Sequence, residues 1–183
     1  MNVEMVNVSQ ANFRDMFDWS ATKQGQDAGC KFCLYWEQPD PSRWPDDPGE
    51  RETMKRRWFQ EVEAEFGPCG KLVYRGSTAI GYAEFAPPKH LPNVSAYACG
   101  PPSDQAVLVA CLFVISDERK KGVGSALVQH IMSDLRDRGA KAVETFARKD
   151  SPNNCSGPLA FWLKHGFAVV REDVGFALVR REL

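Results

Sequence analysis

The sequence predicts an α/β fold in which a twisted, mixed β-sheet of six to seven strands has helices on both faces. The apolar run 106–115 breaks into a basic loop that contains glycine, and an amphipathic helix follows at 122–138. A hairpin pattern at 70–86 precedes this unit, and short apolar runs alternate with a further helical pattern after it. Strands and helices in this order favour a sheet covered by helices on both faces.

Periodicity and turn residues bound the elements before the central strand. Residues 2–8 read as a strand and 10–18 as a short helix. Residues 49–66 read as a charged helix whose buried stripe is Trp58, Phe59 and Val62. The hairpin strands are 70–75 and 78–86, joined at Gly76-Ser77, with alternating apolar positions at Leu72, Tyr74, Ile80 and Tyr82.

The later elements follow the same rules. Helix 122–138 has apolar residues at helical spacing and stops at Gly139; they are Val123, Ala126, Leu127, Ile131 and Leu135. We expect a strand at 141–147, a helix at 157–165 and a final strand pair at 167–172 and 175–182. The strand 175–182 is predicted to be an exposed edge that could pair between subunits, so a monomer and a homodimer both stay open.

Composition narrows the class of protein. The chain has 183 residues, 43% of them hydrophobic, which is enough for one core and one domain over residues 1–183. A net charge of −1 gives no reason to expect nucleic acid or an acidic membrane as partner. We see neither a membrane-spanning run nor a signal-peptide pattern. Six irregularly spaced cysteines fit reduced thiols, so we expect a cytoplasmic protein.

The loop at 119–125 has the chemistry of an anion site. The first N–H groups of a helix lack internal partners and carry partial positive charge, so they attract anions such as phosphates. Gly122 and Gly124 let the backbone approach a ligand closely, and Arg119, Lys120 and Lys121 add positive charge. The spacing matches neither a Walker loop nor a dinucleotide fingerprint.

The pattern Arg119-x-x-Gly122-x-Gly124 resembles the pyrophosphate loop of the GNAT superfamily of N-acetyltransferases. A second segment, Phe161-Trp162-Leu163-Lys164-His165-Gly166-Phe167, is similar to the late "F-Y-x-K-x-G-F" helix end of the same superfamily. Gly166 reads as a helix-terminating residue and Phe167 as the apolar contact after it. The resemblance extends over most of the chain and implies the GNAT fold.

The resemblance also implies an acetyl-CoA-dependent N-acetyltransferase. The pantetheine arm would lie along the central strand as an extra strand, with an N–H near Val114 polarising the thioester carbonyl. The residues expected to bind coenzyme A are Leu112, Phe113, Val114, Arg119, Lys120, Lys121, Gly122, Val123, Gly124 and Ser125. The acceptor would be an amine of a small molecule or peptide, attacking directly in a ternary complex.

The sequence offers several candidates for the acid and the base. The tyrosine common in the family is Trp162 here, so Cys155, Ser156 or Tyr97 would protonate the thiolate, unless it leaves unaided. Cys155 stands where many relatives have an asparagine. The base candidates are Glu84, which alternation places on one face with Tyr82, and Glu144 on the next strand. His90 and His130 are weaker candidates, and we expect His130 to be half-buried.

Two connections are unusually long for a compact domain, residues 19–48 and 87–105, and we assign both to the acceptor side. The first contains Cys30-x-x-Cys33. Packing of both thiols beside Tyr35 and Trp36 is the favoured interpretation, while a zinc site and a redox pair stay open.

The resulting hypothesis is an N-acetyltransferase with an unidentified acceptor. The alternative, favoured by Trp162, is a catalytically weak regulatory module that binds coenzyme A.

Overall fold

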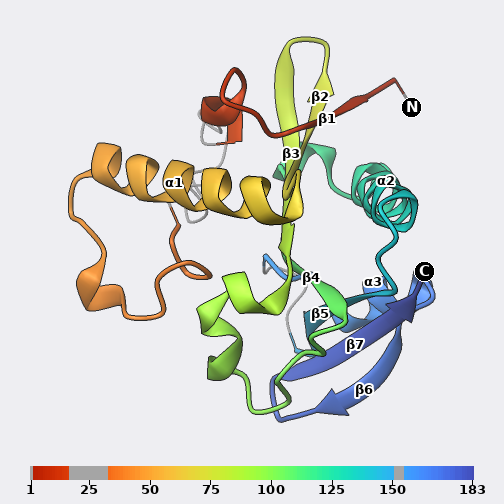
Figure 1. Cartoon of the computed structure of the whole chain (residues 1–183). Helices are drawn as coiled ribbons and strands as arrows, with labels where there is room; N and C mark the ends of the chain where they lie inside the picture. The colour runs from red at the N-terminus through yellow and green to blue at the C-terminus, as the bar shows by residue number, and fades with distance from the viewer. Residues whose placement is uncertain (1, 17–32, 151–154) are drawn as a thin grey trace.

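A computed structural model describes residues 2–16, 33–150 and 155–183 of the chain (Figure 1). Within these residues, seven strands form one sheet in the order β1-β2-β3-β4-β5-β7-β6. The strands are β1 (Glu4–Asn7), β2 (Gly70–Arg75), β3 (Thr78–Ala86), β4 (Ala106–Val114), β5 (Ala142–Arg148), β6 (Ala168–Glu172) and β7 (Phe176–Glu182). The helices are α1 (Pro48–Phe66), α2 (Val123–Asp137) and α3 (Leu159–Lys164).

The sheet is mixed, as predicted. Strands β4 and β5 pair in parallel, whereas the other neighbouring strands run antiparallel. The prediction of an exposed edge at 175–182 is wrong, because β7 lies between β5 and β6. The edge on this side is β6, whose residues are all exposed. Local patterns cannot distinguish an inner strand from its hairpin partner at the edge.

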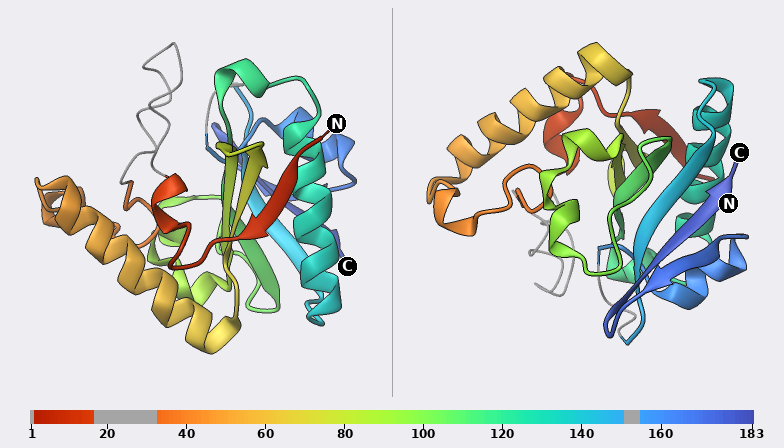
Figure 2. Two further views of the ribbon diagram at one scale, coloured as in Figure 1. Left: turned by 90° about the horizontal axis from the view of Figure 1, so that it is seen from above. Right: turned by 60° about the horizontal axis from the view of Figure 1, so that its bottom comes forward.

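Helices cover both faces of the sheet, as Figure 2 shows with α1 on one side and α2 on the other. One core lies beneath α1 and includes Trp58, Phe59, Leu72, Tyr82 and Phe113. The second core lies beneath α2 and α3 and includes Ala83, Phe85, Leu127, Ile131 and Trp162. Tyr82 therefore faces α1 while Ala83 and Phe85 face α2, as strand alternation predicts.

Local sequence explains the limits of α1. The Asp47 side chain caps its start by accepting from the N–H of Glu50 at 2.9 Å, and Pro48 occupies the first turn. Gly67, at φ 92°, ends it. Its buried residues are the predicted Trp58, Phe59 and Val62, together with Lys55 one turn earlier.

Some predicted elements are shorter or more ordered than expected. Of the helix expected at 10–18, the described part is a 3₁₀ turn at Phe13–Met16. The connection at 87–105 contains 3₁₀ turns at Pro88–His90 and Pro92–Ala96, and a third lies at Pro41–Arg43. Each of these three turns begins with proline, whose fixed φ suits a helical first residue and whose missing N–H would be unpaired there.

Candidate active site

The basic loop links the end of β4 to α2, as its sequence predicts. Lys120 (φ 61°) and Gly122 (φ 86°) both have left-handed backbone, which turns the chain into the helix. The first helical hydrogen bond runs from the N–H of Ala126 to the carbonyl of Gly122 at 3.0 Å. The N–H groups of residues 123–125 therefore precede the helical ladder and have no acceptor within it.

Two ion pairs and one backbone contact shape this loop. The Arg119 Nε donates to the Val114 carbonyl at 2.8 Å, and its guanidinium lies 5.7 Å from the centre of the Phe113 ring. Glu118 pairs with Arg75 at 2.8 Å and with Lys121 at 3.4 Å. Arg119 thus holds the loop against the strand end, and it is more than an added positive charge.

Gly124 stands in the first turn of α2 with room beside it. A Cβ added at this position would meet Phe161 at 3.7 Å and Val114 at 3.8 Å, which are ordinary contacts. Ser125 contributes its hydroxyl to a 3.0 Å hydrogen bond with Nε2 of His165. The protein itself therefore does not need glycine at position 124, so any need for a small residue would come from a ligand.

Strands β4 and β5 diverge beyond their first three residue pairs. Their ladder covers only Ala106–Leu108 against Ala142–Glu144. Further along, the segment 155–158 lies between them: the Leu112 N–H donates to the Cys155 carbonyl at 2.6 Å and the Arg148 N–H to the Gly157 carbonyl at 3.0 Å. We call the gap between the diverging ends of β4 and β5 the splay. Its open end faces the basic loop, which starts where β4 ends.

The backbone of β4 presents alternate residues to this splay. The Ile115 N–H bonds the Ile80 carbonyl of β3 at 3.1 Å, so the antiparallel pattern turns the main-chain groups of Phe113 toward β3 and those of Val114 away from it. Of the three strand residues predicted to bind the cofactor arm, Leu112 and Val114 face the splay and Phe113 does not. The Leu112 N–H is already bonded to Cys155.

Trp162, which stands where the family that the sequence resembles commonly has tyrosine, has a structural role here. Trp162 is fully buried, and its Nε1 donates to the Ser156 carbonyl at 2.6 Å. The indole thereby holds the segment that bonds Leu112. No signal in the sequence indicated this contact, because it joins a helix to a loop through one side chain.

A buried group of charged side chains lies on the α1 side of the sheet. The Lys55 ammonium contacts Glu84 Oε2 at 2.6 Å and also bonds Glu37 Oε1. Tyr82 donates its hydroxyl to Glu84 Oε2 at 2.5 Å. The side chains of Lys55 and Glu37 are each 6% exposed and that of Glu84 is fully buried. We call Glu37, Lys55, Tyr82 and Glu84 the carboxylate–lysine cluster.

Burial controls the protonation of this cluster. Burial is the main cause that raises the pKa of Glu37 to about 8, and repulsion from Glu84 is the second cause. Burial alone would lower the pKa of Lys55, but Glu37 and Glu84 raise it well above its ordinary value. The pKa of Tyr82 is raised by burial and by Glu84. Lys55 is therefore an ammonium and Tyr82 a neutral phenol.

Sequence reasoning named Glu84 as a base candidate but did not identify its partners Glu37 and Lys55. Lys55 precedes Trp58 and Phe59 by three and four residues, a spacing that already placed it on the buried stripe of α1. Glu37 directly follows the aromatic pair Tyr35-Trp36, and its segment is fixed by a 2.9 Å bond from Asn93 Nδ2 to the Tyr35 carbonyl. A lysine on an apolar stripe indicates a buried carboxylate partner.

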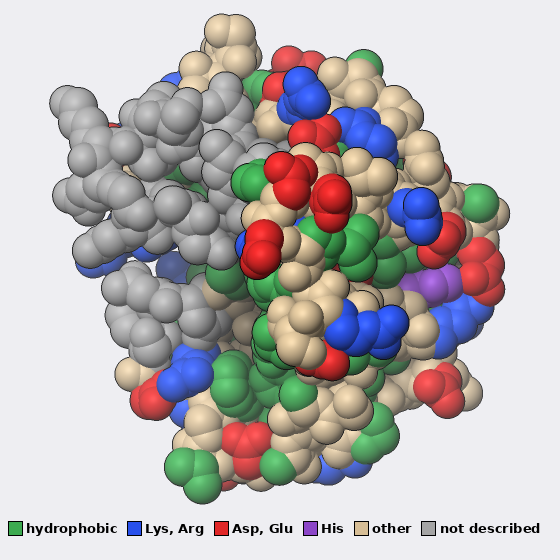
Figure 3. All heavy atoms as spheres, turned by 90° about the vertical axis from the view of Figure 1, so that its left-hand side faces the viewer, with side chains coloured by type: hydrophobic (Ala, Val, Ile, Leu, Met, Phe, Trp, Pro, Cys, Tyr) green, Lys and Arg blue, Asp and Glu red, His purple; other side chains and the backbone are tan. Residues whose placement is uncertain are grey.

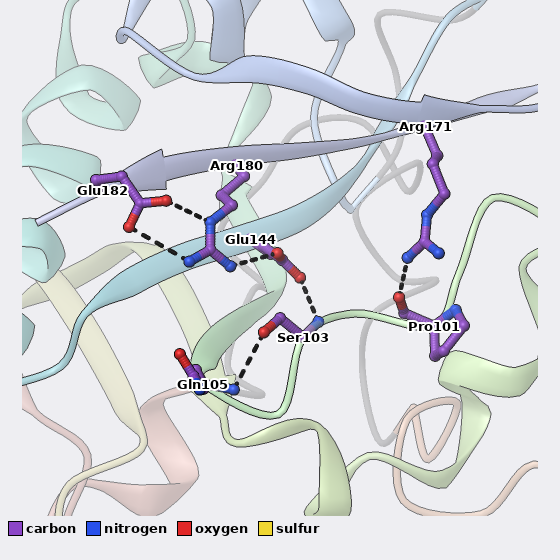
Figure 4. Close-up of polar contacts among 7 residues, drawn as sticks. All are labelled: Pro101, Ser103, Gln105, Glu144, Arg171, Arg180 and Glu182. Carbon is purple, nitrogen blue, oxygen red and sulfur yellow. Dashed lines mark hydrogen bonds and ion pairs between the residues drawn. The ribbon is translucent and has the colours of Figure 1, made fainter.

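In the second base candidate, Glu144, both carboxylate oxygens already accept hydrogen bonds. One oxygen accepts from Arg180 Nη1 at 2.9 Å and the other from the Ser103 N–H at 2.8 Å (Figure 4). Glu144 pairs with Leu108 in the closed part of the β4–β5 ladder, away from the loop. The structure thus separates Glu144 from Glu84, and we assign it a structural role.

The histidine candidates lie elsewhere. His90 is half-buried and its Nε2 lies 3.1 Å from Glu65 Oε2. His130 is exposed on α2, so the expectation of a half-buried side chain is wrong. A helical position near apolar residues predicted burial, but the side chain falls just outside the stripe that faces the sheet.

An aromatic stack joins both long connections to the sheet. The Tyr97 ring is parallel to those of Phe146 and Trp36, with ring centroids 4.0 Å and 5.6 Å away, and Phe176 meets it edge-on at 4.9 Å. On the face in Figure 3, hydrophobic side chains form a band among acidic and basic ones. Tyr97, a candidate acid, is thus a packed aromatic residue whose pKa is raised chiefly by burial.

The cysteine pattern is only partly described. Cys33 is half-buried as a free thiol, and Cys30 lies outside the described residues. In the described ranges, no group of three or more histidine, cysteine, aspartate or glutamate side chains is arranged to hold a metal ion. An open hollow of about 540 Å³ lies near the start of β4, beside Ala106, Leu135 and Arg138, and does not adjoin the loop.

Comparison with known proteins identifies the family. The model of the acetyltransferase (GNAT) family matches residues 30–167, about three quarters of the chain. The chain therefore belongs to the acetyltransferase (GNAT) family. A search of curated proteins found no match. No helix in the described residues is long and apolar enough to span a membrane.

Solved structures share the fold at low sequence identity. PaiA N-acetyltransferase from Thermoplasma acidophilum in complex with coenzyme A matches over 100% of both chains, with 12% identity and a TM-score of 0.62. The ribosomal-protein-S18-alanine N-acetyltransferase from Escherichia coli matches over 99% of this chain and 94% of its own, with 11% identity and a TM-score of 0.58. Arabidopsis thaliana Naa50, in complex with the bisubstrate analogue CoA-Ac-MVNAL, matches over 100% of both chains, with 14% identity and a TM-score of 0.55. These likenesses confirm the predicted GNAT fold.

Proposed function

We propose that this protein is a single-domain N-acetyltransferase that moves an acetyl group from acetyl-CoA to an amine by direct attack in a ternary complex. Membership of the acetyltransferase (GNAT) family supports acetyl transfer. Coenzyme A bound to PaiA and a CoA-based bisubstrate analogue bound to Naa50 support acetyl-CoA as the acetyl donor. The amine acceptor, of a small molecule or a peptide, belongs to the proposal.

The observation that carries the proposal is that the splay between β4 and β5 opens next to the basic loop before α2. The N–H groups of residues 123–125 and the cations Arg119, Lys120 and Lys121 fit a diphosphate, because oriented N–H donors and positive charge both favour a bound anion. The extended arm would enter the gap between β4 and β5. Val114 turns its main-chain N–H toward this gap, whereas the N–H of Leu112, which faces the same way, is bonded to the Cys155 carbonyl.

Chemistry would take place beside Val114. Its N–H would stabilise the tetrahedral oxyanion, which is worth about 3–4 kcal/mol for comparable donors. We assign Glu84 as the base, since its carboxylate lies in a buried and electrostatically tuned cluster. Cys155, whose carbonyl bonds Leu112, is the candidate acid for the departing thiolate.

Variants of Gly124 test the proposed donor site. The Gly124→Ala variant should fold and keep coenzyme A binding, because its Cβ meets nothing closer than 3.7 Å. The Gly124→Leu variant should lower affinity at least about tenfold, equivalent to about 1.4 kcal/mol, by filling the space for the diphosphate. Calorimetric titration measures the affinities, and thermal melting confirms that both variants fold.

Wild-type protein that gives no heat with either coenzyme A or acetyl-CoA would overturn the proposal. Heat without acetyl transfer to any amine would favour the alternative, a regulatory module that binds coenzyme A. That alternative rests on Trp162, whose buried indole cannot supply the proton that a tyrosine hydroxyl would. A thiol-release assay with 1,4-diaminobutane, glucosamine and a short peptide with a free α-amine distinguishes the two.

A further inference from the structure

The carboxylate–lysine cluster contains two buried oxygens with unmet hydrogen-bonding capacity. Glu37 Oε2 and Glu84 Oε1 have no hydrogen-bond partner among the described residues. A buried charged oxygen without a partner costs more free energy than almost any other polar group. The two carboxylates flank a single ammonium, so the cluster would have a net charge of −1 if both were ionised. One additional proton would neutralise it.

The groups around the cluster do not supply the missing positive charge. The thiols of Cys33, Cys69 and Cys111 all have pKa values raised chiefly by burial, so they stay protonated and neutral. Tyr82 is a neutral phenol that already donates to Glu84. Lys55 is the cation that contacts both carboxylates. The balance of charge therefore depends on a proton held by the carboxyl groups themselves.

Both carboxylates contact the same Nζ atom, so they are within the range in which like charges oppose double ionisation. Two carboxyl groups this close titrate as a pair, and the first proton is lost much more easily than the second. The pKa of about 8 for Glu37 agrees with a pair that still holds one proton at neutral pH.

We propose that Glu37 and Glu84 share one proton across Lys55, and that this pair, once ionised, takes the proton that the acceptor amine must lose before it attacks. Glu84 is the base, and Glu37 is a positioning residue that tunes it. The inference rests on the proposed function, because it assigns a proton acceptor to that same site. Glu37 comes from the segment before α1, and Lys55 joins it to the sheet.

The location of the pair relative to β4 suits this role. Glu84 is opposite Cys111 in the β3–β4 ladder, three residues before Val114. A β-bulge at this point leaves Ala110 without a partner in β3 and bends β4 next to the splay. The base is therefore anchored on β3, next to the strand β4 that carries the proposed oxyanion donor.

Both protons that the amine loses during acetyl transfer have an acceptor. The ammonium form of the amine gives one proton to the ionised pair, whose net charge changes from −1 to zero. The neutral amine attacks the thioester carbonyl, a C–N bond forms and the C–S bond breaks. The second amine proton ends on the sulfur of coenzyme A, directly or through Cys155. The pair then releases its proton to solvent.

The shared proton can be observed without activity. In the full chain labelled with ¹³C at glutamate Cδ, one carboxyl signal should titrate near pH 8. It should be absent from Glu37→Gln and unchanged in the matched control Glu61→Gln, whose side chain is exposed on α1. Glutamate signals that all titrate below about pH 6 would overturn the proposal.

The pH dependence of the acetyl-transfer rate tests whether the pair acts as the base. With acetyl-CoA and whichever of the three probe amines reacts, the rise of kcat/KM near pH 8 should move to lower pH in Glu37→Gln, since a neutral amide replaces the carboxyl group whose pKa is about 8. The KM for acetyl-CoA should not change. An active wild type with the same profile in both proteins would overturn the role of Glu37. A wild type inactive toward all amines would overturn the proposed function and with it the catalytic part, whatever the carboxyl titration shows.

Discussion

The ammonium of Lys55 lies 2.6 Å from Glu84 Oε2 and joins α1 to β3 through charges that solvent does not reach. The same Nζ atom bonds Glu37, so one lysine holds together three segments of the chain. A buried ion pair adds little net stability over apolar packing, but removing one partner leaves an uncompensated charge. This asymmetry gives the first prediction.

Replacing Lys55 with methionine should lower the free energy of unfolding by about 3–5 kcal/mol, because the negative charge of the buried Glu37–Glu84 pair would lose its cation. Urea denaturation at pH 7 measures the change. Lys89→Met is the matched control: Lys89 also bonds a glutamate, Glu65, but both side chains are exposed, so its loss should cost less than about 1 kcal/mol. Equal losses would contradict the assignment.

Stability should fall as pH rises through the range in which Glu37 ionises. In the folded protein Glu37 keeps its proton up to about pH 8, whereas in the unfolded chain it loses it near its ordinary value of 4.5. Between these values the folded state binds more protons, so raising the pH favours unfolding. Melting curves from pH 5 to 8.5 should show a smaller loss of Tm for Glu37→Gln than for wild type. Parallel curves would argue against a proton on Glu37 in the folded state.

Reversing the charge of Lys120 should weaken coenzyme A binding about tenfold at low salt, equivalent to about 1.4 kcal/mol. Lys120 is exposed and lies next to the start of α2, so its ammonium would face the diphosphate. The effect of Lys120→Glu should shrink at high salt because screening weakens charge interactions. The control is Arg57→Glu, the same charge change on the exposed face of α1, which should leave affinity unchanged.

Removing the Glu144 carboxylate should affect stability and leave catalysis intact. Glu144→Ala deprives Arg180 and the Ser103 N–H of an acceptor, which should cost about 1–3 kcal/mol in urea denaturation. Glu182→Ala removes the other, exposed partner of Arg180 and should cost less than about 1 kcal/mol. Folded Glu144→Ala that loses acetyl transfer more than about tenfold would restore Glu144 as a catalytic candidate.

Much of the fold could be predicted because its signals are local. The hairpin bounds 70–75 and 78–86 agree with the structure, since Gly76 at φ 60° marks the turn and apolar alternation marks the strands. The basic loop and α2 follow for similar reasons: glycine and helical spacing act within a few residues. The family model and the solved structures confirm the fold that these patterns indicated.

Patterns of this kind could not settle the candidate site. Alternation placed Tyr82 and Glu84 on one face, but it could not identify what covers that face. Glu84 and Glu144 looked alike in sequence, each an acidic residue on an apolar strand. They differ in the structure because one meets Lys55 from α1 and the other meets Arg180 from β7.

The sequence alone determined where the strands and helices form, where the anion-binding loop lies and which family the chain resembles, because turn residues and periodicity act over short stretches of backbone. Tertiary structure decided that β7 is an inner strand, that Trp162 braces the segment 155–157, and that Glu37, Lys55 and Glu84 meet. The strand order and the meeting of Glu37, Lys55 and Glu84 depend on contacts between residues far apart in the chain, and charges become strongly coupled only after folding removes the water between them. The Trp162 bond is short in sequence, but it depends on how α3 packs against the preceding loop.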